Sequence, residues 1–138
     1  AATRSQLEDP KAHIILPEII SKEPLGPVVR HGDNQWGDLV RWTLNAMIIA
    51  EELGVTSENV DEMKNSKNPE IQRLLGVSGE YGEMLGLSKD WAYNVIKAIG
   101  NYGESFDRHL GPDTAIGLER GLNALWSKGG ILYAPPFR

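Results

Sequence analysis

The chain of 138 residues contains no cysteine. This absence excludes a disulfide scaffold, a cysteine zinc site and a thiol nucleophile, and it leaves the redox compartment open. Basic charge is also scarce, because 14 Lys and Arg stand against 19 Asp and Glu and give a formal net charge of −5. Nucleic-acid binding depends on clustered Lys and Arg that displace counterions, so no nucleic-acid partner is expected.

Long apolar runs are missing as well. No run approaches the roughly 20 residues that a membrane-spanning helix requires. The opening stretch, AATRSQLEDP, has no initiator Met and lacks the basic and apolar regions of a signal peptide. It is typical of a helix that ends near Asp9-Pro10, because a helix seldom continues past the residue before a proline. We therefore expect the chain to be a piece of a longer protein.

The residues that are present are typical of one folded domain, with 41% hydrophobic and 24% charged residues. Two apolar runs near the start, Ile14 to Ile20 and Leu25 to Arg30, suit short strands. A polar SKEP separates them, and prolines stand at positions 17, 24 and 27. The sequence therefore predicts a mainly α fold with a short β element in this region.

Helical periodicity dominates after Gly32. Apolar residues recur every three or four positions beyond Asp33 or Asn34, either of which can cap the helix, and Gly54 is a left-handed stop. Shorter helices are predicted over 57–63, capped by Ser57, and over 68–75. A glycine-rich loop or single turn should follow.

Two further helices are predicted in the last third of the sequence. The first runs over 88–110 and should bend at Gly100 and Gly103, which weaken a helix interior. The second runs over 113–128. The tail ILYAPPFR is predicted to be extended, because Pro135-Pro136 cannot continue a helix.

The glycine-rich segment GVSGEYGEMLG could indicate a phosphate-binding loop, but the spacing of its glycines does not support that interpretation. It matches neither the dinucleotide fingerprint nor the P-loop, and no predicted strand precedes it. His13 and His31 lack partners at the spacing of metal ligands, and no serine stands in a nucleophile-elbow context.

An acidic cluster, Glu104, Asp107 and His109, crowds one helical region. Metal binding or acid/base chemistry is one reading, but a solvated acidic face is the usual explanation for carboxylates three residues apart. We therefore expect no enzyme, no catalytic residue, no metal site and no cofactor.

Several long sequence blocks resemble those of one known protein family and occur in the same order along the chain. They are ILPEIISKEPLGPVVRHGDNQW, RWTLNAMIIAEELGVTSENVDEM, NPEIQRLLG, LGLSKDWAYNVIKAIGNYGESFDRHLG and RGLNALWSKGGILYAPPFR. Together they resemble the C-terminal part of general L-amino-acid-binding receptors of bacterial ABC importers, the family 3 solute-binding proteins. The resemblance implies a periplasmic, two-lobed α/β clamshell (type II) that captures an L-amino acid and delivers it to ABC permease subunits.

The resemblance also implies a division of the chain. Residues 1–22 would be the end of the second lobe and the outgoing hinge strand, and residues 23–138 the C-terminal part of the first lobe with a helical extension. The polar stretch between the strands would absorb the dihedral changes of lobe closure. The hinge residues would be Ser21, Lys22, Glu23, Pro24 and Gly26.

Most of the ligand site is expected upstream of Ala1, where the family's carboxylate and arginine for the amino acid would lie. The ligand-binding residues of this chain are therefore unknown, and the chain alone should bind amino acids weakly or not at all. Unpaired strand edges should instead recruit a complementing N-terminal half or a swapped homodimer. The main alternative is a helical protein-interaction module without a small-molecule ligand, and an enzyme comes third.

Overall fold

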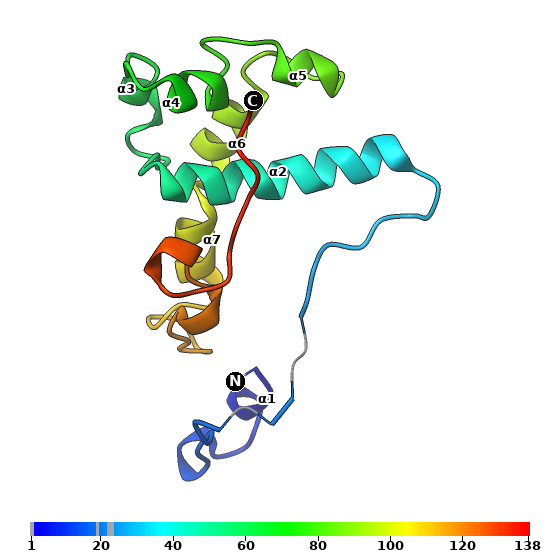
Figure 1. Ribbon diagram of the computed structural model, residues 1–138. Coiled ribbons are helices and arrows are strands. Elements are labelled where there is room, and N and C mark those ends of the chain that lie inside the picture. The colour runs from blue at the N-terminus through cyan, green and yellow to red at the C-terminus, as the bar shows by residue number, and fades with distance from the viewer. Residues whose placement is uncertain (1, 19, 22–23) are drawn as a thin grey trace.

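The chain divides into an extended N-terminal part and a helical body (Figure 1). The computed structural model describes residues 2–18, 20–21 and 24–138. Within them, a short helix α1 (Ala2–Ser5) and a 3-10 turn (Pro10–Ala12) precede the body. Asp9 caps that turn by accepting hydrogen bonds from the backbone N–H groups of Lys11 and Ala12 at 3.2 and 3.3 Å. The helix predicted to end near Asp9-Pro10 ends earlier, at Ser5, and Pro10 instead begins the 3-10 turn.

Helix α2 (Asn34–Glu52) is the axis of the body and contacts α4, α6 and α7. Asp33 caps it by accepting a hydrogen bond from Trp36 N at 3.2 Å, and Gly54 follows its end with φ of 68°. Residues 46–50 are all buried, so the C-terminal half of α2 is enclosed on every side. A helix that is apolar all round must pack between neighbours, and both predicted ends of α2 are confirmed.

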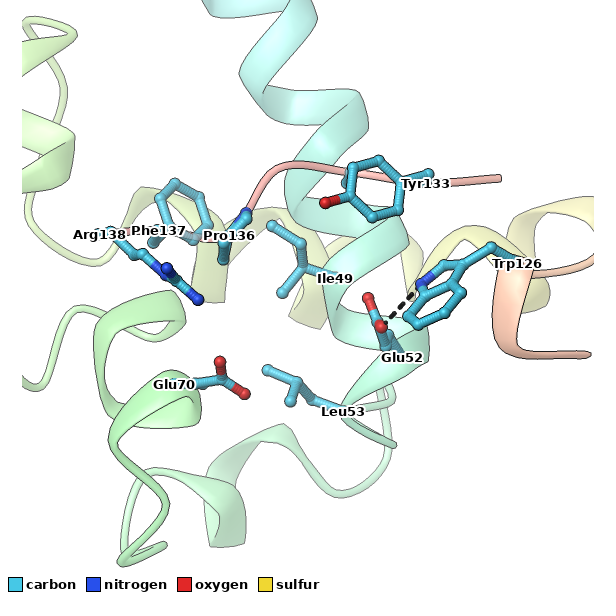
Figure 2. Close-up of a pocket in the computed structure, with 10 residues that line it drawn as sticks. Ile49, Glu52, Leu53, Glu70, Trp126, Tyr133, Pro136, Phe137 and Arg138 are labelled. Atoms are coloured by element: carbon cyan, nitrogen blue, oxygen red, sulfur yellow. Dashed lines mark hydrogen bonds between the residues drawn. The ribbon is translucent and has the colours of Figure 1, made fainter. Parts of the chain in front are cut away.

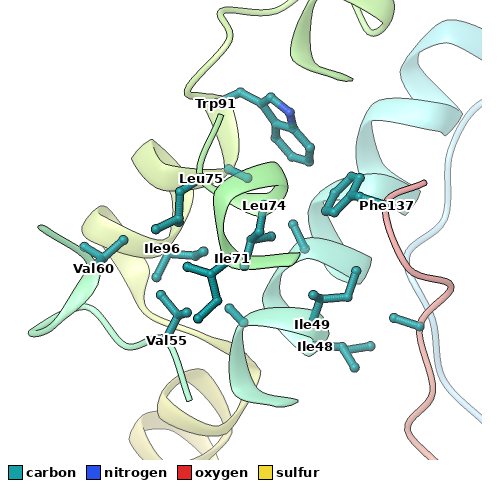
Figure 3. Close-up of a cluster of buried hydrophobic side chains, with 14 of the residues drawn as sticks. Ile48, Ile49, Val55, Val60, Ile71, Leu74, Leu75, Trp91, Ile96 and Phe137 are labelled. Atoms are coloured by element: carbon teal, nitrogen blue, oxygen red, sulfur yellow. The ribbon is translucent and has the colours of Figure 1, made fainter. Parts of the chain in front are cut away.

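The smaller helices pack around this buried half. They are α3 (Val60–Met63), α4 (Pro69–Leu74), α5 (Tyr81–Met84), α6 (Trp91–Ile99) and α7 (Tyr102–His109). Helices α4, α6 and α7 contact α2 directly, and α3 contacts α6. The buried core between them includes Ile49, Leu74, Leu75 and Ile96 (Figure 3). The predictions of a mainly α fold, of the helix over 68–75 and of a single turn in the glycine-rich segment are confirmed.

The start predicted for the helix over 57–63 is wrong. Thr56 and Asn59 exchange side-chain-to-backbone hydrogen bonds of 2.8 and 3.2 Å, which form a turn that delays α3 until Val60. Ser57 does not cap this helix and instead donates to Glu104 of α7.

The long helix predicted over 88–110 is two helices. Gly100 has φ of 82° and ψ of −176°, a conformation that only glycine adopts readily, and it ends α6. Asn101 then starts α7 with a capping box: its side chain accepts from Glu104 N at 3.0 Å, while Glu104 Oε2 accepts from Asn101 N at 2.8 Å. The predicted bend is therefore a complete break with a new cap.

The helix predicted over 113–128 is also wrong. Gly117 and Gly121 take φ values of 62° and 47°, and only short 3-10 turns form at Gly121–Asn123 and Trp126–Lys128. Tertiary contacts decide this region, because the chain folds back so that Leu125 forms a parallel bridge with Leu132. The tail after Leu132 is extended as predicted.

The two predicted strands do not form in the part of the chain that the structure describes. Ile14, Ile20, Leu25 and Val28 are 81%, 96%, 97% and 94% exposed. A strand requires the backbone of a partner strand, and none lies beside this segment. The short β element is therefore an extended, unpaired segment. The same described residues hold no helix that is long and apolar enough to cross a membrane.

Candidate functional site

The extended segment over residues 13–32, called the arm below, connects the N-terminal turns to α2 and runs apart from the body (Figure 1). The predicted hinge residues Ser21, Pro24 and Gly26 lie in it and are exposed, whereas Lys22 and Glu23 lie outside the described residues. A Cβ built on Gly26 would meet no atom within 4 Å. Gly26 therefore has open space around it.

The arm joins the body where Val29 is half-buried. A Cβ on Gly37 of α2 would lie 3.6 Å from Val29 Cγ2, so the arm packs against the start of that helix. A turn follows, in which Asp33 N donates to Arg30 O at 3.3 Å and Gly32 has φ of 84°. Beyond this anchor the arm presents apolar side chains and unpaired peptide groups, which are what strand addition to another sheet requires.

The acidic cluster predicted at Glu104, Asp107 and His109 is not a joint site. Glu104 is directed to Ser57, accepting from Ser57 Oγ at 2.6 Å and from Ser57 N at 3.1 Å, whereas Asp107 and His109 are exposed. Burial raises the pKa of Glu104, but hydrogen bonds from Ser57 and Asn101 outweigh it and hold the pKa below its ordinary value of 4.5. Glu104 is therefore an ionised structural group that ties the loop before α3 to α7.

The glycines of the segment GVSGEYGEMLG serve packing. A Cβ on Gly76 would collide with the carbonyl of Lys89, and a Cβ on Gly82 would collide with the carbonyl of Ser88. These glycines let two backbone segments approach each other beside Trp91. His13 pairs through Nδ1 with Asp9 O at 2.9 Å, and the described residues contain no group of three or more His, Cys, Asp or Glu that could hold a metal ion.

A pocket that sequence reasoning missed lies beneath the tail and encloses about 260 Å³ (Figure 2). One side is α2, with Ile49, Glu52 and Leu53, and Glu70 of α4 faces it from below. The remaining lining comes from the end of the chain: Trp126, Tyr133, Ala134, Pro136, Phe137 and Arg138. Trp126 Nε1 donates to Glu52 Oε1 at 3.0 Å, so one of the two carboxylates already has a partner.

Phe137 fills an aromatic box beside this pocket. Its ring centroid lies 5.3 Å from that of Trp42, 5.6 Å from that of Tyr81 and 6.3 Å from that of Trp91. The box joins α2 to the starts of α5 and α6, and Phe137 is only 8% exposed within it. Apart from the general helical periodicity, no sequence signal indicated this site, because Phe137 comes from a distant, irregular part of the chain.

Comparison with known proteins identifies relatives along almost the whole chain. A general L-amino acid-binding periplasmic protein of Rhizobium johnstonii is 61% identical over 137 residues, which are 98% of this chain and 40% of that protein. A glutamate/glutamine/aspartate/asparagine-binding protein of Rhodobacter capsulatus is 57% identical over 139 residues, or 100% of this chain and 41% of the relative. A putative amino-acid ABC transporter-binding protein of Escherichia coli is 54% identical over 138 residues, or 99% and 40%.

Comparison with solved structures identifies a protein of the same kind. An ABC transporter periplasmic binding protein from Brucella ovis, with glutathione bound, superposes with a TM-score of 0.92 and is 54% identical. The match covers 98% of this chain and 43% of that structure. No family profile matches the chain. The chain thus spans about 40% of the length of the curated relatives that it matches.

Proposed function

We propose that this chain, a homologue of amino-acid-binding periplasmic proteins of ABC transporters, forms part of a receptor that captures L-amino acids in the periplasm for import. One observation carries the proposal: identity of 54–61% extends over 98–100% of the chain in its curated relatives. Such identity along a continuous stretch implies a common fold and a common place in the assembled protein. The relatives are binding proteins, and no enzymatic role is proposed.

The arm supports this assignment. It is extended and exposed in most of its described residues, and apart from Val29 its described apolar side chains are exposed. A segment that leaves one lobe of a clamshell, crosses a hinge and enters the other would look this way without the remaining lobes. We propose that residues 1–22 belong to the second lobe, that residues 23–138 belong to the first, and that the hinge comprises Ser21, Lys22, Glu23, Pro24 and Gly26.

Ligand capture itself is assigned to the part of the receptor that this chain does not contain. Neither the pocket beneath the tail nor a second one over residues 29–41 is lined by a buried carboxylate together with a buried arginine, the pair that could grip the two ends of an amino acid. The arm would complete the sheets of both lobes, with a complementing N-terminal half or a swapped second copy as its partner. The assembled receptor would then dock on ABC permease subunits.

A chimera tests the proposal. The matching 137 residues of the R. johnstonii relative are replaced by this chain, and binding of L-glutamate, L-glutamine and a branched-chain amino acid is measured by calorimetry. We expect dissociation constants within about tenfold of those of the unaltered relative. A chimera that folds, as judged by its melting transition, yet binds none of these ligands would contradict the proposal.

The chain by itself is the companion experiment. With the ligand groups absent, calorimetry should detect no amino-acid binding. A micromolar or tighter dissociation constant for the verified chain would show that the ligand residues are assigned to the wrong part of the protein.

The role of the arm has its own test within the chimera. Ile20→Asn should reduce ligand affinity or stability sharply, because Ile20 is 96% exposed here and would be buried in a lobe of the receptor. Met84→Asn, at a body position that is 80% exposed, is the matched control and should have little effect. If both variants changed ligand affinity and stability equally, the arm would not belong to the sheets of the lobes.

A helical protein-interaction module is the second candidate, because the body has a core of its own. Light scattering separates the two readings. Association through the arm supports the receptor, whereas a stable monomer at tens of micromolar with a sharp, cooperative melting transition would favour the module.

A further inference from the structure

The last eight residues of the chain, 131–138 and called the strap below, lie across the helical body (Figures 1 and 2). The strap enters through Leu132, whose N–H donates to Ala124 O at 3.1 Å and whose carbonyl accepts from Trp126 N at 2.9 Å. Beyond that point residues 133–138 make no hydrogen bond to any described residue. Side-chain contacts alone hold residues 133–138 in place.

Those contacts are concentrated at two positions. Ala134 is 4% exposed, and Phe137 occupies the aromatic box of Trp42, Tyr81 and Trp91. Stacked and edge-on aromatic pairs add directional attraction to the burial of apolar area. The strap therefore binds through one dominant anchor, as short peptides commonly do in protein grooves.

The backbone of the strap is suited to act as a ligand. Pro135 and Pro136 fix φ and favour the extended polyproline conformation, so little conformational entropy is lost when the segment docks. Proline-rich peptides dock in aromatic-lined grooves for the same reason. At the other end, Gly129 and Gly130 donate hydrogen bonds to Trp126 O and Leu125 O at 3.3 and 3.0 Å, and a Cβ on Gly130 would collide with the carbonyl of Ala124. The glycine pair therefore fixes the base of the strap, and only the residues beyond Leu132 are free to detach.

Charge also matches between the strap and its seat. Arg138 lines the pocket together with Glu52 and Glu70 (Figure 2). Among the described residues Arg138 has no ion pair within 4.0 Å, so its attraction to the two carboxylates is long-range and screened by salt. The groove therefore favours a basic residue directly after the aromatic anchor.

We propose that this groove is a peptide-binding site for an extended Pro-Pro-aromatic-basic sequence, filled here by the chain's own strap and able to accept the strap of a second copy. Rotation about the backbone at Tyr133 would release residues 133–138 from their own groove, and exchange between two copies would preserve the side-chain contacts of these residues. The proposal is argued from contacts within this chain and does not rest on the proposed function.

The test uses the full chain with Phe137→Ala, which empties the aromatic box, and a fluorescent synthetic peptide, ILYAPPFR. Fluorescence anisotropy should show that F137A binds this peptide at least about tenfold more tightly than the unaltered chain does, because the intact strap competes from a high effective concentration. The fluorescence of Trp42 and Trp91 should change on binding. The peptide ILYAPPAR should not bind.

Three outcomes would overturn the proposal: no binding by F137A with an unchanged helical spectrum, equal binding by F137A and the unaltered chain, or equal binding of the two peptides. If F137A loses its helical spectrum, Phe137→Leu, which keeps an apolar anchor without the ring contacts, takes its place under the same criteria. Glu70→Gln added to the emptied variant should weaken the peptide about two- to threefold at low salt and by less at high salt.

Discussion

Leu25 in the arm and Leu75 in the body are 97% and 0% exposed. The two regions have similar apolar residues, yet the described arm residues before Val29 are exposed and the body buries a continuous core. Local sequence does not cause this difference. A helix satisfies its own backbone and needs a partner for one face only, whereas a strand needs a second strand for every peptide group. The body therefore forms within this chain, whereas the described arm residues find no strand partner in it.

Hydrogen exchange should show the largest contrast between the two regions. Amides of described arm residues such as Ile15 and Val28 have no backbone partner and should exchange at rates close to those of an unfolded peptide. Amides in the buried half of α2 should exchange more slowly by a factor of about a thousand or more, since they open only with the core. Mass spectrometry of peptides from both regions measures this, and protection of the arm would indicate pairing that the structure lacks.

A matched pair of substitutions should show the next largest effect. Leu75→Ala deletes fully buried methyl groups and should lower the free energy of unfolding by about 2–5 kcal/mol. Leu25→Ala removes the same atoms from solvent and should change it by less than about 0.5 kcal/mol. Urea denaturation followed by circular dichroism compares the two. A comparable loss from both variants would mean that the arm is folded onto something in solution.

Two glycines, one in the body and one in the arm, compare how strongly the backbone is constrained in the two regions. At Gly100 the φ of 82° is strained for any other residue, and a Cβ would lie 2.7 Å from Glu104 Cδ. Gly100→Ala should therefore cost about 1–3 kcal/mol. Gly26→Ala in the arm meets open space and should be close to neutral. Thermal melting of both variants decides the question; tolerance at Gly100 would mean that α6 and α7 can join into one helix.

The smallest expected effect is the pH dependence contributed by Glu104. Its pKa is lowered in the folded chain, so its stabilisation is present above the unfolded pKa and is lost as pH falls through the folded value. Glu104→Gln should cost about 1 kcal/mol near neutral pH, and the cost should shrink towards zero below about pH 4. Denaturation across pH checks this. Asp107→Asn on the same helix should leave the pH profile unchanged, and a cost for E104Q that is constant with pH would contradict the assignment.

The presence of most helices was predictable from the sequence. Asp33 and Asn68 cap α2 and α4 as their residue types predict, and Gly54 follows the end of α2. The break between α6 and α7 was predicted only as a bend, because the capping box of Asn101 and Glu104 looks like ordinary helix sequence. The helix expected over 113–128 failed because the return of Leu132 beside Leu125 satisfies that backbone in another way.

The candidate sites also differ in whether the local sequence predicted them. The polar, proline-flanked stretch around Ser21 and Pro24 was recognisable as a connection, and the resemblance that identified it agrees with relatives that are 54–61% identical. The hinge role itself stays a prediction. The pocket and the aromatic box were not predictable, because their residues come from segments separated by up to about a hundred positions and no local spacing connects them.

The sequence by itself determined the acidic, cysteine-free composition, the helical periodicity and the caps of individual helices, since these depend on residue type and on neighbours within a few positions. Tertiary structure alone decided that Phe137 lies against Trp42, that Glu104 binds Ser57, and that the arm stays unpaired. Each of these depends on whether a partner distant in the chain, or outside it, reaches the same place in space. Burial is a property of that arrangement, not of any single stretch of sequence.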